Sequence, residues 1–303
     1  MSIYAAVEGG GTSWVVALVS DRPDNIVERM SVVTETPEIT LGKIREWLNT
    51  KKFDALGVAS FGPVDCKISS PTYGFITSTP KPNWANTDVL RLLGVYDEFA
   101  SIPCLFDTDV NAPALAEFNL HKQSANMSSA AYITVGTGIG VGLVVNGSTV
   151  KGLVHPEGGH LLVQTKPGDT FAGCCPYHGR CVEGLVASGA LCARKGCSIH
   201  DLPTFGDDDE LWDTVAYYLA QLCCNLILTV SPEHISIGGG VMNRKCLYPK
   251  IRTFTLALLN DYIKHTLLTP ANIEQLIGPS FWESQAGIVG AAYLAQLALE
   301  NKK

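Results

Sequence analysis

Four residues in a glycine-rich segment have the types and the spacing of a metal site. His160 is followed by Cys175, His178 and Cys181. Two thiolates and two imidazoles suit a tetrahedral Zn²⁺, and short spacers let the ligands wrap one ion. Spacing alone does not choose between Cys174 and Cys175, and chance clustering of reduced thiols is the alternative. Because four protein ligands leave no open position on the metal, we expect a structural zinc rather than a zinc hydrolase.

Three glycine clusters, each after an apolar run, have the composition of phosphate-binding turns. Glycine lets backbone N–H groups converge on an anion, and a following threonine adds a hydroxyl donor. One such cluster is as well explained by a tight turn, whereas three favour a polyphosphate. The chain lacks G-x-x-x-x-G-K-[ST], G-x-G-x-x-G and the protein-kinase motifs, which leaves ATP in another α/β cleft as the simplest ligand. The clusters are Gly9-Gly10-Gly11-Thr12, Gly136-Thr137-Gly138-Ile139-Gly140 and Gly238-Gly239-Gly240.

The segment DTDVN, residues 107–111, carries a candidate acid–base group. Alternation along the preceding strand would put Asp107 and Asp109 on one face at its carboxyl end, where open α/β sheets bind ligands. Pro113 falls in the first turn of the next helix, whose dipole favours an ionised carboxylate. Asp109 could then accept a proton from an attacking hydroxyl. Helix capping by Asp109 or Asn111 is the alternative.

Two further carboxylates lie close in sequence to the candidate metal site. Glu157 is part of HPEGGH at 155–160, and Glu183 follows the last cysteine of the cluster. Carboxylates held by a rigid loop accept well from vicinal hydroxyls, so this segment predicts a polyol substrate. Ordinary solvated loop carboxylates are the alternative.

These residues must be positioned by elements that repeat along the chain. Residues 3–20 and 130–147 each have an apolar run, a glycine turn and a second apolar run, the pattern of a β-hairpin. Two such hairpins predict a duplicated domain with a ligand between the halves, and two unrelated hairpins are the alternative. Residues 151–181 have no clear period and predict a long functional loop. We expect buried strands within 53–65 and 102–111, and helices over 39–50, 86–96, 212–230, 247–265 and 284–302.

Composition limits the classes of function. The 303 residues, 46% hydrophobic and 17% charged, are enough for two cores. A formal net charge of −7 argues against nucleic acid as a partner. The first residues lack the pattern of a secretion signal, and ten cysteines in such a chain indicate free thiols in the cytoplasm. The uncharged stretch 214–232 is interrupted by Gln221 and Asn225, so we expect a buried helix and no membrane partner.

Taken together, the motifs resemble those of the ROK family of sugar kinases, over nearly the whole chain. HPEGGH, CPYHGRC and YGFITSTPKPNW at 73–84 are similar to the fructokinase branch. The motifs that occur in the family order are EGGGT at 8–12, DTDVN at 107–111, VGTGIGVG at 135–142, HPEGGH at 155–160, CPYHGRCVEG at 175–184 and ISIGGGVM at 235–242.

The resemblance implies an α/β fold of the actin-like, hexokinase-like ATPase type, with two ribonuclease-H-like domains around a central cleft. We expect a smaller N-terminal domain over 1–110 that includes the C-terminal helix, about 285–303. The larger domain would cover 111–284 and carry the zinc loop. The family also implies ATP and Mg²⁺ as cosubstrates, a structural Zn²⁺ and a homodimer.

By the same resemblance, each matching residue takes a role. Asp109 matches the catalytic base. The phosphate and adenosine loops match Gly10, Gly11, Thr12, Gly136, Thr137, Gly239 and Gly240; the sugar contacts match Asn111, Glu157, His160 and Glu183; and the zinc ligands match His160, Cys175, His178 and Cys181, which selects Cys175 over Cys174. Departures from the family pattern are Glu8 for Asp, Ser13 for Lys, Thr108 for Asn, and a histidine in place of one zinc-binding cysteine.

We therefore expect ATP-dependent phosphorylation of a hexose, D-fructose at its 6-hydroxyl. Mannose, glucose or an amino sugar is the alternative substrate, because a few hydrogen bonds decide the choice of sugar. A non-catalytic sugar sensor is a further alternative, since the family includes transcriptional repressors. Those carry a helix-turn-helix ahead of the first hairpin, where this sequence has only Met1 and Ser2.

Overall fold

In a computed structural model, which describes residues 2–302 without the side chains of residues 123–125, the chain divides into two compact units. The first comprises Met1–Leu120, Ser148–Pro156 and Gln285–Lys303, and the second comprises His121–Gly147 and Glu157–Ser284. Compared with the expected N-terminal domain, the first unit also includes residues 111–120 and the short segment 148–156.

The first unit is built on one mixed sheet with the strand order β3-β2-β1-β4-β7. β1 (Ile3–Gly9) and β2 (Ser13–Ser20) form the first expected hairpin, and β3 (Ile26–Val33) continues it in antiparallel fashion. β4 (Ala55–Ser60) and β7 (Cys104–Thr108) run parallel to β1. The carboxyl ends of these three parallel strands therefore meet at one edge of the sheet. The short strands β5 (Phe75–Ile76) and β6 (Thr87–Asp88) form a separate two-stranded sheet. The short strand β10 (Ser148–Thr149) is an edge strand of the second five-stranded sheet.

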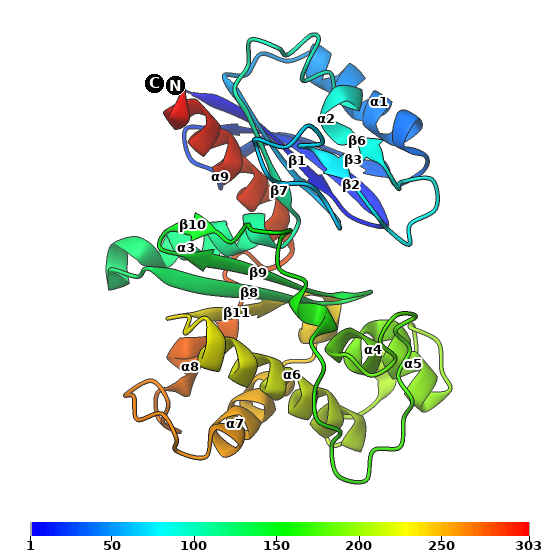
Figure 1. The fold of residues 1–303 in the computed structure, drawn as a ribbon, viewed down its shortest axis with the longest axis vertical. Helices are drawn as coiled ribbons and strands as arrows, with labels where there is room; N and C mark the ends of the chain where they lie inside the picture. The colour runs from blue at the N-terminus through cyan, green and yellow to red at the C-terminus, as the bar shows by residue number, and fades with distance from the viewer. Residues whose placement is uncertain (1, 303) are drawn as a thin grey trace. The chain divides into compact units, whose positions relative to one another are not determined.

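Helices cover this sheet because it is apolar on both faces. α1 (Pro37–Asn49) buries Leu41, Ile44 and Leu48, one stripe at helical spacing. α9 (Ala286–Asn301) packs on β1, β4 and β7, and its alanines and glycines allow a close approach (Figure 1). The remaining helices are α2 (Val89–Leu92) and α3 (Asn111–Ala125).

The second unit repeats the strand order of the first. β8 (Ser129–Val135) and β9 (Ile139–Val145) form the second expected hairpin, and β11 (Ile235–Gly238) and β12 (Ile277–Pro279) follow in parallel. The order β9-β8-β11-β12 thus matches β2-β1-β4-β7. The similarity between the two hairpin sequences correctly predicts two related halves.

Helices α4 (Val182–Val186), α5 (Ser188–Lys195), α6 (Glu210–Thr229), α7 (Leu247–Leu259) and α8 (Ile273–Leu276) complete the second unit. α6 and α7 lie side by side (Figure 1). By length and composition α6 could cross a membrane, but 78% of its apolar window is buried inside the structure. The interpretation of this stretch as a buried helix is confirmed. The 3-10 helices are η1 (Gly158–His160), η2 (Leu202–Thr204), η3 (Gly240–Asn243) and η4 (Glu283–Gln285).

Two expected helices are shorter than the apolar spacing predicts. Within 86–96 only α2 is helical, because Gly94 adopts a left-handed conformation with φ of 82° soon after it. Within 247–265 the helix ends at Leu259, where Asn260 and Asp261 have φ of 47° and 57°. Asparagine and aspartate tolerate this region better than other residues, so the polar pair ends the helix despite the apolar spacing beyond it.

Candidate functional site

The first glycine turn, Gly9–Thr12, rests on buried aromatic rings. Trp14 follows the turn and stacks on Trp84, with ring centroids 5.4 Å apart, while Phe61 packs edge-on against both. Both indoles are fully buried, so they fix the loop that ends at Trp84. That loop carries Lys81, whose Nζ donates to the Gly11 carbonyl oxygen at 2.6 Å.

Lys81 is a candidate site residue that sequence reasoning missed. It brings a cation to the first glycine turn, where it can contact the same anion as the backbone N–H groups. The family pattern has its lysine at the position of Ser13, and this chain supplies one from a loop about 70 residues downstream. No spacing signal connects the two segments, because the contact depends on how the loop folds over the aromatic rings.

Asp109 lies one residue beyond β7, at the carboxyl edge of the first sheet. Its N–H donates to the Ser60 carbonyl oxygen at 2.9 Å, and its side chain is partly exposed. The Thr108 hydroxyl accepts the Asn111 N–H at 2.8 Å and so caps the start of α3.

Asp107 is a fully buried carboxylate that organises the neighbouring polar groups. Its Oδ1 accepts from the Thr108 N–H at 2.8 Å and from Nδ2 of Asn111 at 2.9 Å. Its Oδ2 accepts from the Thr149 hydroxyl at 2.8 Å and lies 2.9 Å from Nζ of Lys151. The charge is therefore paired and hydrogen-bonded, as burial requires, and the side chain of Asn111 is held in one orientation.

Glu8 faces the same edge from β1. The strand registers put Glu8, Ala59 and Asp107 in one row across β1, β4 and β7, with the small Ala59 between the two acids. Burial raises the pKa of Glu8 to about 7, the negative charge of Asp109 acts in the same direction, and Arg29 opposes both. Glu8 is thus close to half-protonated at neutral pH.

In the second unit, two glycine turns lie at neighbouring strand ends. Gly136 and Thr137 follow β8, while Gly239 and Gly240 follow β11, which runs parallel to β8. Gly239 has φ of 94°, and a Cβ there would lie within 2.7 Å of the Val135 backbone, so only glycine fits. The structure brings these predicted residues together.

Gly136, Thr137 and Gly240 line a pocket of about 720 Å³. The guanidinium of Arg244 lies 4.7 Å from the ring centre of Trp212, and both residues belong to the same pocket. A wall that combines glycine backbone donors with flat and apolar side chains fits a nucleoside phosphate. Sequence reasoning missed the rest of the wall, since these side chains come from helices and loops without a motif. They are Ser188, Leu191, Ile199, Leu202, Pro203, Asp207, Trp212, Val241, Asn243, Arg244 and Lys245.

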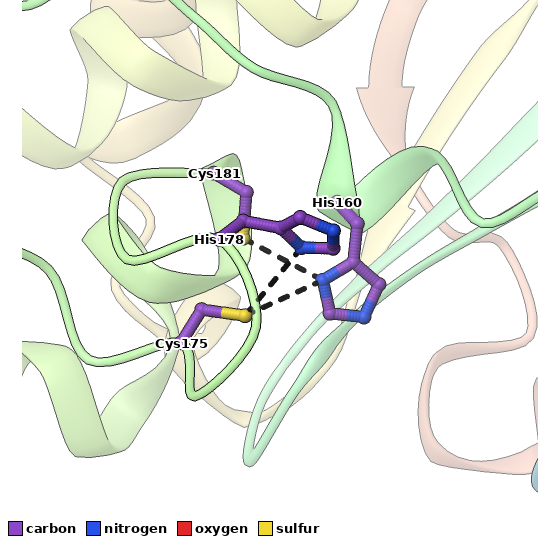
Figure 2. Close-up of side chains that lie close together, drawn as sticks. All are labelled: His160, Cys175, His178 and Cys181. Atoms are coloured by element: carbon purple, nitrogen blue, oxygen red, sulfur yellow. Dashed lines mark hydrogen bonds between the residues drawn. The ribbon is translucent and has the colours of Figure 1, made fainter. Parts of the chain in front are cut away.

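The four predicted metal ligands point toward one another (Figure 2). Sγ of Cys175 lies 3.7 Å from Nδ1 of His160 and 3.7 Å from Nδ1 of His178. Sγ of Cys181 lies 3.5 Å from Nδ1 of His160, and all four ligand atoms are within 4.8 Å of one another. Sulfur and nitrogen ligands of a tetrahedral Zn²⁺ lie about 3.5 Å apart, so the cluster fits zinc. Cys174 is exposed and outside the cluster.

The thiols of the cluster would have to lose their protons in order to bind a cation. Burial raises the pKa of Cys181 to about 11, and the neighbouring Cys175 adds to this effect, while the Gly184 N–H donates to its Sγ at 3.4 Å and opposes it. A divalent cation would reverse the shift, because a coordinating thiol is deprotonated. Binding of a metal by this cluster would therefore release the thiol protons.

Glu183 connects this cluster to the second glycine turn. Its Oε2 accepts from the Ile139 N–H at 3.0 Å, and its Oε1 lies 3.9 Å from Nε2 of His160. Glu157 is exposed, and its carbonyl oxygen accepts the His160 N–H at 3.0 Å. The structure thus groups the predicted sugar contacts Glu157, His160 and Glu183 around one turn.

Comparison with known proteins gives matches over almost the full chain. A family model described as ROK family matches residues 4–298. The fructokinase of Zymomonas mobilis subsp. mobilis is 41% identical over 308 residues, which cover 99% of this chain and 98% of that protein. The fructokinase of Lactococcus lactis subsp. cremoris is 38% identical over 298 residues, which cover 97% and 98%.

Among solved structures, a ROK family glucokinase from Streptomyces griseus, in complex with glucose and AMPPNP, superposes with a TM-score of 0.72. The sequence identity is 19%, and the match covers 97% of this chain and 99% of that chain. This likeness confirms the expected fold class, an α/β fold of the hexokinase-like type.

Proposed function

Because the chain belongs to the ROK family, we propose that it is an ATP-dependent fructokinase that phosphorylates the 6-hydroxyl of D-fructose. The near full-length identity of about 40% with fructokinases carries this proposal. The position of Asp109 at the carboxyl edge of the first sheet supports it, because open α/β sheets bind ligands at that edge.

In the proposed reaction Asp109 is the general base. It accepts the proton of the sugar hydroxyl as the oxygen attacks the γ-phosphorus, and ADP leaves in line. Asn111 holds the sugar, with its amide oriented by the buried Asp107 carboxylate. A hydroxyl held in one orientation attacks far more readily than a mobile one, so this positioning of the sugar should increase kcat.

The glycine turns are the proposed ATP contacts. Gly10, Gly11 and Thr12 offer phosphate donors in the first unit, and Lys81 adds a cation. In the second unit, Gly136 and Thr137 take phosphate, Gly240 borders the nucleoside pocket, and Gly239 precedes it in the same turn. Mg²⁺ would neutralise charge on the transferring phosphoryl group. Glu8 lies one residue before the first glycine turn, in one row with Asp107 across the first sheet.

We propose a structural role for zinc at His160, Cys175, His178 and Cys181. All four ligands come from protein, so the metal would fix the loop rather than activate water. Through His160 and the backbone around it, the metal would set the positions of Glu157 and Glu183 for the sugar hydroxyls. We further propose that the protein is a homodimer in the cytoplasm, a compartment that keeps its ten free cysteines reduced.

A coupled ADP-release assay with ATP and Mg²⁺ tests the proposed reaction. The panel is fructose, mannose, glucose and N-acetylated hexosamines, and phosphorus NMR of the product identifies the phosphorylated hydroxyl. We expect the highest kcat/KM on fructose, with fructose 6-phosphate as product. A higher kcat/KM on another sugar would identify that sugar, rather than fructose, as the preferred substrate. If folded, zinc-loaded protein turned over none of the sugars, the proposed kinase activity would be rejected.

A further inference from the structure

Two partly exposed cysteines lie at the C-terminal end of α5. The helix ends at Gly196, which is left-handed with φ of 64° and ψ of 36°. Both the Gly196 N–H and the Cys197 N–H donate to the Cys192 carbonyl oxygen, the latter at 3.1 Å. A bond from the second residue past the helix back to this carbonyl defines a Schellman ending.

A Schellman ending brings the side chains at its two end positions into contact. In most proteins this contact is apolar, but here the two positions are Cys192 and Cys197. Cys197 is close enough to the Cys192 thiol to raise its pKa. Their spacing of five residues thus gives a thiol pair that the backbone itself holds together.

This pair differs from five of the other eight cysteines among residues 2–302, whereas Cys104 and Cys246 are also partly exposed and Cys174 is exposed. Cys66, Cys223 and Cys224 are buried, and burial raises the pKa of each thiol above its usual range. Cys175 and Cys181 belong to the proposed zinc cluster. Cys192 and Cys197 are partly exposed, so an oxidant in solution can reach them.

We propose that Cys192 and Cys197 form a reversible disulfide in the presence of a peroxide, and that this disulfide weakens nucleotide binding. For hydrogen peroxide, the two oxygens leave as two waters in two steps, and each water takes up one of the two thiol protons. A thiolate attacks the peroxide to give a sulfenic acid and water, and the second thiolate displaces the hydroxyl to give the disulfide and a second water. A dithiol reductant restores both thiols.

The link to the nucleotide rests on neighbouring residues and on the proposed function. Leu191 and Ile199, which flank the pair in sequence, both line the pocket of about 720 Å³. Two thiols in contact must close to a bond of about 2.05 Å to form the disulfide. The chain between Cys197 and Ile199 then moves toward α5, and the pocket wall shifts with it.

The rate of oxidation should depend on pH. Burial raises the pKa of Cys192, and the neighbouring Cys197 and Asp201 act in the same direction. Only the thiolate attacks an oxidant, so the thiol pair reacts slowly at neutral pH and faster at alkaline pH. This dependence distinguishes the pair from a sensor cysteine that is already ionised at neutral pH.

The test is peptide mapping of folded, zinc-loaded protein after exposure to hydrogen peroxide and alkylation of the remaining thiols. Arg194 and Lys195 lie between the two cysteines, so trypsin cuts there and an oxidised pair appears as two joined peptides. Cleavage before Asp201 separates Cys197 from Cys223 and Cys224, and fragmentation identifies the linked residues. Affinity for ADP is measured calorimetrically on the same samples, without need of sugar turnover.

We expect a Cys192–Cys197 linkage and a roughly fivefold or greater loss of ADP affinity. Both should be reversed by dithiothreitol and be missing in Cys197→Ser, while Cys246→Ser, a partly exposed cysteine outside the pair, should behave as wild type. Oxidation of other cysteines without this linkage would overturn the proposal, as would the linkage with unchanged ADP affinity. A protein that forms the linkage and loses ADP affinity but phosphorylates no sugar would reject the fructokinase and leave the disulfide standing.

Discussion

The ammonium group of Lys151 lies 2.9 Å from Oδ2 of Asp107, a carboxylate with no exposed surface. The pair joins the segment after β10 to the end of β7, the strand that leads to Asp109. Through its other oxygen, Asp107 holds Nδ2 of Asn111. The charge of Lys151 thus helps Asp107 to hold Asn111, a proposed sugar contact.

Replacement of Lys151 by Met should destabilise the fold by about 1–3 kcal/mol, because a buried carboxylate loses its cation but keeps its hydrogen bonds. The change is measured by denaturant unfolding at neutral pH. Lys151→Arg retains the charge and should lie closer to wild type. A Lys151→Met protein as stable as wild type would show that the pair does not hold this edge together.

Glu8 should make the stability of the protein depend on pH. Its pKa in the folded state is about 7, above the usual value of 4.5, so the folded state binds the proton more tightly than the unfolded state. The free energy of unfolding therefore loses a contribution as pH rises from about 4.5 to 7. Glu8→Gln has no carboxyl group to ionise at this buried position, so its free energy of unfolding should not fall in this way. It should be more stable than wild type at pH 8, and the difference should shrink toward pH 5.

Thermal or denaturant unfolding of wild type and Glu8→Gln across this pH range checks the expectation. Glu46→Gln, on the exposed side of α1, is the matched control and should follow the wild-type curve. A constant difference between Glu8→Gln and wild type at all pH values would contradict the raised pKa.

Lys81→Met should lower kcat/KM for ATP by roughly tenfold to a hundredfold, the loss expected for one charge-assisted contact to phosphate. The KM for fructose should change little, because Lys81 contacts the glycine turn rather than the proposed sugar residues. Lys67 is exposed and lies earlier in the same region, so Lys67→Met controls for a general loss of positive charge. Equal effects of the two substitutions would remove Lys81 from the phosphate site.

Zinc binding should depend on Cys175 and not on the adjacent Cys174. Cys175→Ser should lose the metal and melt at a lower temperature, because a structural zinc contributes to folding. Cys174→Ser, at an exposed position outside the cluster, should keep both the metal and the stability. Metal analysis of the purified proteins gives the result, and loss of zinc in both variants or in neither would contradict the proposed ligand set.

Much of the fold could be predicted from local sequence. The hairpins at 3–20 and 130–147 have alternating apolar runs around glycines, and the structure forms both. The ends of α2 and α7 could not be predicted, because single left-handed residues, Gly94 and Asn260, end the helices against the apolar spacing.

The candidate site was predictable where its residues are close in sequence. Cys175, His178 and Cys181 lie within one short loop, and their grouping follows from spacing. The contacts of Lys81 with Gly11 and of Lys151 with Asp107 join distant segments, and they depend on packing that a sequence does not display.

The most direct measurement of the central claim is the turnover of Asp109→Asn with ATP, Mg²⁺ and fructose, alongside fructose binding by calorimetry. The amide keeps the size of the side chain but cannot accept the proton as a carboxylate does. We expect kcat to fall roughly 10²- to 10⁴-fold with nearly unchanged fructose affinity. Wild-type turnover in Asp109→Asn would contradict the assignment of Asp109 as the base.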